Sequence, residues 1–143
     1  MTSKGKNKKN KDLISELIES RENSDLGGGL EKIENQHSKG KMTARERIDV
    51  LFDKGSFREI DALMTHRQSD FGLDQKKIPG DSVVIGFGKI NDRMVGVFSQ
   101  DPTVMGGSFS EVQGQKVAKI FDLALDSGVP VVGLMDSVGA RIQ

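Results

Sequence analysis

The sequence predicts an α/β fold in which helices come first and a β-hairpin, a helix and a buried strand follow. Apolar residues recur with helical spacing between residues 12 and 52. Two β-rich segments then flank Asn91-Asp92, and an apolar run over 129–135 follows one further helical pattern. Helix and strand patterns that alternate in this way are typical of an α/β domain.

The first two helices are expected in the N-terminal forty residues. Within 12–26 the leucines and isoleucines recur four residues apart, until three glycines at 27–29 interrupt the pattern. A second short helix is predicted over 30–39, and Gly40 is placed to end it.

A third helix begins at a capping box. The Thr43 hydroxyl can accept the backbone N–H of Glu46, while the Glu46 carboxylate reaches back to Thr43. This helix carries Ile48, Leu51 and Phe52 on one face and stops at Lys54-Gly55. A short strand is expected over 57–60.

A β-hairpin is the clearest strand signal. Residues 83–87 and 94–98 are rich in β-branched and aromatic side chains, and Asn91-Asp92 supplies the turn between them. Residues 61–80, which precede the hairpin, are polar, and we expect a surface loop with some helical turn.

A second helix-start signal follows the hairpin. Gly106-Gly107 predicts a tight loop, and the segment Ser108-Phe109-Ser110-Glu111 is expected to form another capping box. The helix after it ends at Gly128. Its predicted buried residues are spaced i, i+3, i+4, i+7 and are Val117, Ile120, Phe121 and Ala124.

The last elements form the start of a βα unit. The apolar run at 129–135 has the length of a strand and is expected to be buried on both faces. Residues 136–141 then resemble a strand-to-helix turn. The sequence stops at Gln143, where the next helix should begin, so we expect a cut rather than a completed unit.

The composition is that of a globular protein and excludes several classes of function. The 143 residues include 21 basic and 21 acidic side chains, so the formal net charge is zero. The absence of cysteine excludes disulfides, cysteine-based zinc sites and thiol catalysis. There are seven Phe but no Trp or Tyr, which leaves few platforms for stacking nucleic-acid bases. No apolar stretch approaches the roughly 18 residues that cross a bilayer.

The first eleven residues differ from the rest. They hold five lysines and no acidic residue, which predicts a solvated, disordered tail. The alternative is contact with a nucleic acid or an anionic surface, although no nucleic-acid partner is expected. They also lack the apolar region of a secretory signal, and cysteine is absent, so we expect a cytoplasmic protein.

Most familiar motifs are incomplete here. Gly86-Phe87-Gly88 precedes a hairpin turn instead of the helix that a dinucleotide site requires. Residues 40–43 lack the first glycine and the Ser/Thr of a phosphate-binding loop. His37 and His66 have no paired ligands, so no metal site is predicted.

Two loops remain as candidate sites, Gly106-Gly107-Ser108 and Ser137-Val138-Gly139-Ala140. Backbone N–H groups at such loops can bind a phosphate or stabilise the oxyanion that develops on a thioester carbonyl. The alternative is that both are simply tight turns built from small residues.

Several blocks of the sequence resemble one enzyme family. Residues 39–49 (KGKMTARERID) are closely similar to a signature of biotin-dependent acyl-CoA carboxyltransferases, such as the β subunits of propionyl-CoA carboxylase. Other similar blocks follow the order of that family: 27–29 with 36–37, 78–81 (IPGD), 98–101 (FSQD) with 106–108 (GGS), and 136–143 (DSVGARIQ). The resemblance covers residues 12–143 and only the opening part of the family's chain.

The resemblance implies a crotonase-like fold, a spiral of ββα units that is incomplete here and is preceded by N-terminal helices. It implies that a carboxyl group moves between carboxybiotin and a short-chain acyl-CoA of the propionyl-CoA/methylmalonyl-CoA type. Biotin is then carried on a partner, a biotin carrier protein, with biotin carboxylase or decarboxylase subunits also present. The full-length form is expected to be a homo-oligomer.

The resemblance also implies site residues. The backbones of Val138 and Gly139 match an oxyanion hole for the acyl-CoA carbonyl, and Gly106, Gly107, Ala140 and Arg141 match substrate-binding positions. Val138 stands where the family has glycine. A positive φ there would strain the backbone by roughly 1–3 kcal/mol.

Three hypotheses follow for this chain. It is the amino-terminal part of a carboxyltransferase that is active only when complete. Alternatively, it is a non-catalytic remnant that binds CoA or docks on a full-length subunit, or an unstable truncation product.

Overall fold

The computed structural model describes residues 3–75 and 77–141, with side chains over 12–69, 72–75 and 77–141. Met1, Thr2, Ile142 and Gln143, which belong to the predicted tail and the last similar block, lie outside the described residues. The α-helices and strands, in chain order, are α1 (Ser3–Asp25), α2 (Leu30–Ser38), α3 (Ala44–Leu51), β1 (Arg58–Ile60), β2 (Val83–Ile90), β3 (Arg93–Gln100), α4 (Glu111–Ser127) and β4 (Val131–Leu134).

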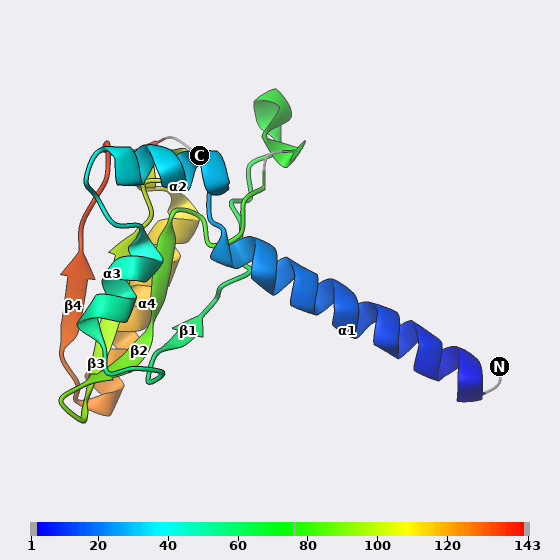
Figure 1. The fold of residues 1–143 in the computed structure, drawn as a ribbon, viewed down its shortest axis with the longest axis horizontal. Helices are drawn as coiled ribbons and strands as arrows, with labels where there is room; N and C mark the ends of the chain where they lie inside the picture. Colours follow the sequence, from blue (N-terminus) through cyan, green and yellow to red (C-terminus); the bar gives the residue numbers. More distant parts are fainter. Residues whose placement is uncertain (1–2, 76, 142–143) are drawn as a thin grey trace.

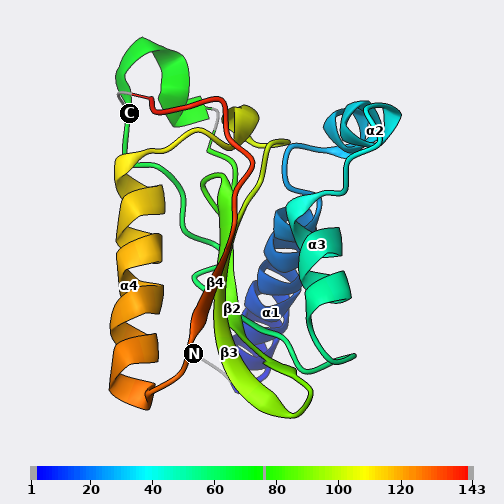
Figure 2. The same cartoon turned by 90° about the vertical axis from the view of Figure 1, so that its left-hand side faces the viewer.

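A four-stranded sheet, in the order β1-β2-β3-β4, separates two helical layers among the described residues. Strands β1, β2 and β3 are antiparallel, whereas β4 runs parallel to β3 after the crossover through α4. Figure 2 shows α4 on one face of the sheet and α3 on the other. The predicted sequence of hairpin, helix and strand is therefore confirmed.

The alternation of side chains along β2 builds two cores, one on each face of the sheet. Val84 packs with Ala44, Ile48 and Phe52 on the α3 side. Val83 and Ile85, which point the other way, pack with Ile120 of α4. The hydrophobic effect on both faces thus fixes the register of β2, because a slip of one residue would exchange the two sets.

The hairpin turn has the predicted residues and the expected geometry. Asn91 and Asp92 both have positive φ, at 49° and 62°, as a two-residue type I′ turn requires. The carboxylate of Asp53 accepts both of their backbone N–H groups, at 3.2 and 2.9 Å. This contact ties the loop after α3 to the tip of the hairpin.

The glycines of the apparent dinucleotide motif have a packing role. A Cβ on Gly86 would lie 2.2 Å from the carbonyl oxygen of Arg58, and one on Gly88 would lie 2.7 Å from the Phe52 ring. Close approach of the neighbouring strand and of the core ring therefore requires glycine at both positions.

Helix α1 differs from the prediction. It begins at Ser3, so residues 3–11 are helical where a disordered tail was expected. Lysine has a high intrinsic helix propensity, and here it extends the helix that the leucines and isoleucines of 13–18 continue. Figure 1 shows α1 projecting away from the rest of the molecule, and its apolar side chains from Leu13 to Ile18 remain more than half exposed.

The second predicted capping box was placed two residues too early. Ser110 is the N-cap of α4, and its hydroxyl accepts the Gln113 N–H at 3.0 Å. Ser108 instead donates its hydroxyl to the Met105 carbonyl at 2.7 Å. The loop before α4 is longer than expected because Met105–Gly107 forms a tight 3₁₀ turn first.

The buried face of α4 also differs in part. Ile120 and Ala124 are buried as predicted, but Val117 is only half-buried and Phe121 is 50% exposed. Strand β4 is half-buried, not covered on both faces. It lies at the edge of the sheet that the described residues form, so nothing in them packs beyond it (Figure 1).

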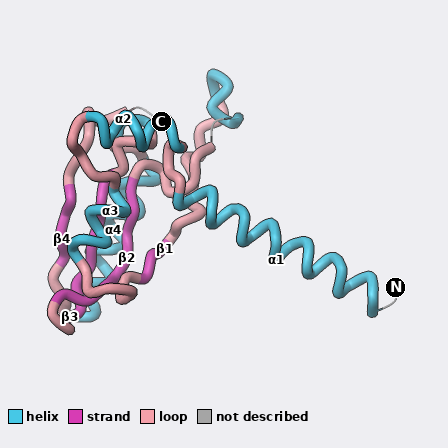
Figure 3. The backbone as a smooth tube through the Cα atoms, in the orientation of Figure 1, coloured by secondary structure: helices cyan, strands magenta, loops and turns pink. Residues whose placement is uncertain are grey.

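The segment between β1 and β2 is a loop with one helical turn at Asp70–Gln75, as predicted (Figure 3). Among the described residues, no helix combines the length and the apolar character needed to span a membrane.

A lysine lies at the centre of the α4 contact with the sheet. The side chain of Lys116 is fully buried, and its ammonium donates to the carbonyl oxygens of Gly80 and Val83 at 2.8 and 2.6 Å. Burial lowers the pKa of Lys116 to about 8, although the nearby carboxylates of Glu59, Asp61 and Asp81 act in the opposite direction. The guanidinium of Arg45 lowers this pKa further.

The free energy of unfolding is expected to rise with pH between about pH 8 and 10.5 because of Lys116. Folded Lys116 loses its proton near pH 8, whereas the unfolded chain keeps it to the ordinary value, so the unfolded state binds more protons in this window. The gain amounts to at most about 3–4 kcal/mol. Urea unfolding of wild type and Lys116→Met across this range measures it, and equal slopes for the two proteins would contradict the assignment.

The capping box of α3 provides a second stability prediction. The Glu46 N–H donates to the Thr43 hydroxyl at 3.3 Å, and the Thr43 N–H donates to the Glu46 carboxylate at 2.7 Å. These contacts, with the backbone N–H of Thr43 first and His37 next, lower the pKa of Glu46. Thr43→Ala should reduce the free energy of unfolding by about 1 kcal/mol. Thr43→Ser, which keeps the hydroxyl, is the control and should lie within the error of wild type.

Candidate functional site

The two candidate loops lie side by side, because they follow neighbouring parallel strands. Residues 101–110 leave the carboxyl end of β3, and residues 135–141 leave the carboxyl end of β4. Backbone bonds join them: Val138 N–H donates to the Gly106 carbonyl at 3.1 Å, and Phe109 N–H donates to the Gly139 carbonyl at 2.8 Å. The structure therefore brings Gly106, Gly107, Val138 and Gly139 together at one edge of the sheet.

Glycine is required in the first loop by this close approach. Gly106 and Gly107 have φ of 66° and 68°. A Cβ on Gly107 would lie 2.2 Å from the Asp136 carbonyl oxygen, and one on Gly106 would lie 2.9 Å from the Val138 side chain. Any larger residue here would push the two loops apart.

The two predicted oxyanion-hole donors are in different situations. The Val138 N–H is bonded to the opposite loop, as described above. Within the described residues, the Gly139 N–H donates to the hydroxyl of Ser137, two residues away, at 3.1 Å. A hydroxyl can rotate away from such a local bond, so Gly139 has the N–H that is more easily released to a ligand.

The valine causes no backbone strain. Val138 does not have a positive φ, whereas Gly139 has φ of 126°. The side chain of Val138 is 82% exposed and lies against Gly106. Valine is thus tolerated where the resemblance implies glycine, and the left-handed conformation falls on the glycine that remains.

The side chain of Arg141 points into the protein. One guanidinium nitrogen forms an ion pair with the Asp81 carboxylate, and the other donates to the Ser108 carbonyl at 2.8 Å and to the Ser82 hydroxyl at 3.1 Å. Only 9% of the Arg141 side chain and 1% of the Asp81 side chain are exposed. The resemblance implied a substrate contact for Arg141, but its guanidinium binds groups of the protein. Ala140, beside it, is exposed.

The other end of the same loop is held by the N-terminal helices. The Asp136 carboxylate accepts the amide of Gln36 at 3.1 Å and the ammonium of Lys41 at 3.1 Å. Its backbone N–H donates to the side chain of Gln100 at 3.0 Å. The segment 136–141, which we call the site loop, is therefore anchored at both ends.

The turn that receives Arg141 is strained and buried. Asp81 and Ser82 have φ of 44° and 62°, and both are 1% exposed. Helix α4 holds this turn: the Gln113 amide donates to the Ser82 carbonyl at 3.1 Å, next to the two carbonyls that Lys116 binds. The Ser110 hydroxyl donates to the Asp81 carboxylate.

No sequence pattern indicates a role at the site for this turn or for Gln113 and Lys116, and Ser110 is expected only as part of a capping box. Residues 78–81 were noted only as one similar block. The unusual Asp-Ser pair after Gly80 is a weak turn signal. Nothing local indicates that it receives a side chain sixty residues away.

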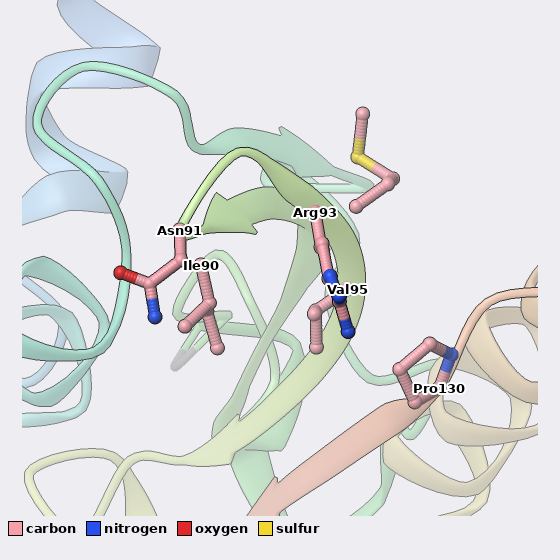
Figure 4. Close-up of a pocket in the computed structure, with 6 residues that line it drawn as sticks. Ile90, Asn91, Arg93, Val95 and Pro130 are labelled. Atoms are coloured by element: carbon pink, nitrogen blue, oxygen red, sulfur yellow. The ribbon is translucent and has the colours of Figure 1, made fainter.

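A cavity of about 610 Å³ lies at the opposite end of the sheet, beside the hairpin tip (Figure 4). It is lined by Ile90, Asn91, Arg93, Met94, Val95 and Pro130. None of the predicted site residues borders it. Among the described residues, no group of three or more His, Asp or Glu side chains is placed to hold a metal ion.

Comparison with known proteins supports the resemblance found in the sequence. The model of the carboxyl transferase domain family matches residues 35–143. The propionyl-CoA carboxylase beta chain of Roseobacter denitrificans is 53% identical over 133 residues, which cover 93% of this chain and 26% of that protein. The mitochondrial beta chain of Homo sapiens is 56% identical, covering 91% of this chain and 25% of that protein. The methylmalonyl-CoA decarboxylase alpha subunit of Propionigenium modestum is 51% identical, with the same coverage.

Solved structures agree. A transcarboxylase 12S structure, described as a hexamer with methylmalonyl-coenzyme A bound, superposes with a TM-score of 0.87 and 47% identity, covering 91% of this chain and 25% of that one. A single-chain long-chain acyl-CoA carboxylase gives 0.78 and 30%, covering 87% of this chain and 14% of that one. These likenesses confirm the crotonase-like prediction. The chain spans about a quarter of the length of the curated relatives that it matches.

Since the family model matches most of its residues and the relatives share about half of them, the chain belongs to the carboxyl transferase domain family.

Proposed function

We propose that this chain supplies the acyl-CoA carbonyl site of a biotin-dependent carboxyltransferase. The reaction moves a carboxyl group between carboxybiotin and a short-chain acyl-CoA of the propionyl-CoA/methylmalonyl-CoA type. The observation that carries the proposal is the pairing of the site loop with Gly106-Gly107, which leaves the Gly139 N–H at an exposed position with only a local partner.

In this proposal the Gly139 N–H turns from Ser137 to the thioester oxygen. The proton beside the thioester carbonyl would pass to the biotin on the partner, once its carboxyl group had left as CO₂. The negative charge of the resulting enolate develops on the thioester oxygen. A backbone donor stabilises this charge more than it stabilises the neutral carbonyl, and it therefore accelerates the step. The Val138 N–H joins as a second donor only if its bond to Gly106 opens.

The same geometry explains why a site without catalytic His or Cys suffices. Backbone N–H groups stabilise the oxyanion without themselves gaining or losing a proton. The exposed Val138 side chain, which lies against Gly106, forms the surface on which the acyl group would lie, beside Ala140.

Biotin, carried on a partner protein, supplies or takes up the carboxyl group when it is bound. The proposed partners are a biotin carrier protein and a biotin carboxylase or decarboxylase subunit, with further copies of the chain in a homo-oligomer. A cytoplasmic location and the absence of nucleic-acid partners remain predictions.

A matched pair of glycine variants tests the proposal. Gly139 and Gly128 both have positive φ, and a Cβ added to either meets no atom within 4 Å. Alanine therefore strains both backbones without a clash, but only Gly139→Ala displaces the proposed donor. In the native protein with its biotin-bearing partner, Gly139→Ala should lower kcat roughly 10²–10³-fold. Gly128→Ala, at the C-cap of α4, should keep the wild-type kcat.

The readout is transfer of labelled carboxyl between methylmalonyl-CoA and biotin. A wild-type protein that binds acyl-CoA without transfer would support the non-catalytic CoA-binding alternative and overturn the proposal. Equal kcat values for Gly139→Ala and wild type would exclude Gly139 as the donor.

A further inference from the structure

One buried side chain, that of Arg141, holds the carboxyl end of the site loop. Ser137, Val138, Gly139 and Ala140 are all exposed, and Arg141 is the first residue after them whose side chain is anchored inside the protein. Its backbone N–H also donates to the Phe109 carbonyl at 2.9 Å. The placement of the Gly139 N–H is therefore coupled to the placement of the Arg141 guanidinium, two residues away.

Asp81 is the only acidic partner that the described residues give to Arg141. One oxygen of its carboxylate binds the guanidinium, and the other accepts the hydroxyl of Ser110, the N-cap of α4. Asp81 thus joins the first turn of α4 to the end of the site loop. A carboxylate with two such partners holds its position more precisely than an exposed ion pair does.

The backbone around Asp81 is itself held in an unusual conformation. The positive φ of Asp81 and Ser82 is unfavourable for residues other than glycine, and strain of this kind persists where the surroundings impose it. Here Lys116 and Gln113 impose it through bonds to the carbonyls of Gly80, Ser82 and Val83. The turn is therefore a rigid binding site for the Arg141 guanidinium.

We propose that Asp81 is a positioning residue of this site: through Arg141 it sets where the Gly139 N–H lies relative to the thioester oxygen. This inference rests on the proposed function. Asp81 touches neither substrate nor reacting atoms. Its effect is expected in the transition state, where the distance between donor and oxyanion matters most.

The test compares two aspartates that share a positive φ and a basic partner, one buried and one partly exposed, within the native protein and its biotin-bearing partner. Asp61 also has a positive φ, of 56°, and its carboxylate binds a basic residue of α4, Lys119, at 2.5 Å. It does not contact the site loop. Asp81→Asn should lower kcat for carboxyl transfer about tenfold or more, with KM for acyl-CoA within about twofold of wild type. Asp61→Asn should keep the wild-type kcat.

Both kcat values are expressed per folded enzyme, with Tm measured on the same samples, so that loss of stability alone does not lower them. Because Asp81 acts through Arg141 in this proposal, the two substitutions should not add. The double variant Asp81→Asn/Arg141→Lys should have nearly the kcat of whichever single variant has the lower kcat. The inference would be overturned if the fold-loss in kcat of the double variant equalled the product of the two single losses. An unchanged kcat in Asp81→Asn would also overturn it.

If Asp81→Asn does not fold, Arg141→Lys decides the question, because it keeps a positive charge beside Asp81 but loses the fork that reaches Ser108. A lowered kcat at nearly the wild-type Tm supports the inference, and an unchanged kcat overturns it. Wild-type protein without carboxyl transfer would instead refute the proposed function, so the two failures are distinguishable.

Discussion

The bonds from Lys116 to the carbonyl oxygens of Gly80 and Val83 connect helix α4 to the sheet at its buried centre. A fully buried ammonium is costly unless hydrogen bonds replace its water, and two carbonyls on either side of one turn do so here. The same bonds hold the strained backbone between those carbonyls. Strand β2, helix α4 and the turn at Asp81-Ser82 are therefore packed as one unit. A substitution that moves one of them is expected to move the others.

The proposed site lies where this unit meets the edge of the sheet. The parallel strands β3 and β4 end at the same side of the sheet, so their loops are neighbours. Glycines at the contact allow the two backbones to approach closely. The chemistry that follows uses backbone N–H groups, so the side chains of the site have a supporting task. Asp136 holds one end of the site loop and Arg141 holds the other, and the residues between them remain exposed.

Much of the fold could be predicted because its signals are local. The capping box of Thr43 and Glu46, the Asn91-Asp92 turn and the alternation along β2 each depend on residues a few positions apart. The mistakes concern burial and boundaries. Phe121 and both faces of β4 were expected to be covered, because an apolar residue indicates only that burial is favourable, and not what is available to cover it. The cap at Ser110 was misplaced because Ser108 and Ser110 are equally good caps by type.

Short patterns of residues were enough to predict the order of the elements, the glycine-rich loops and the family. The contacts that the site residues make became clear only in the folded chain. In the fold, Arg141 points inward to Asp81. The Val138 N–H is bonded to the opposite loop, whereas the Gly139 N–H has a local partner. The backbone of Val138 does not have a positive φ. The reason is physical: these outcomes depend on contacts between segments up to sixty residues apart, and a hydrogen bond or ion pair over that separation exists only once packing has brought its two groups within about 3 Å.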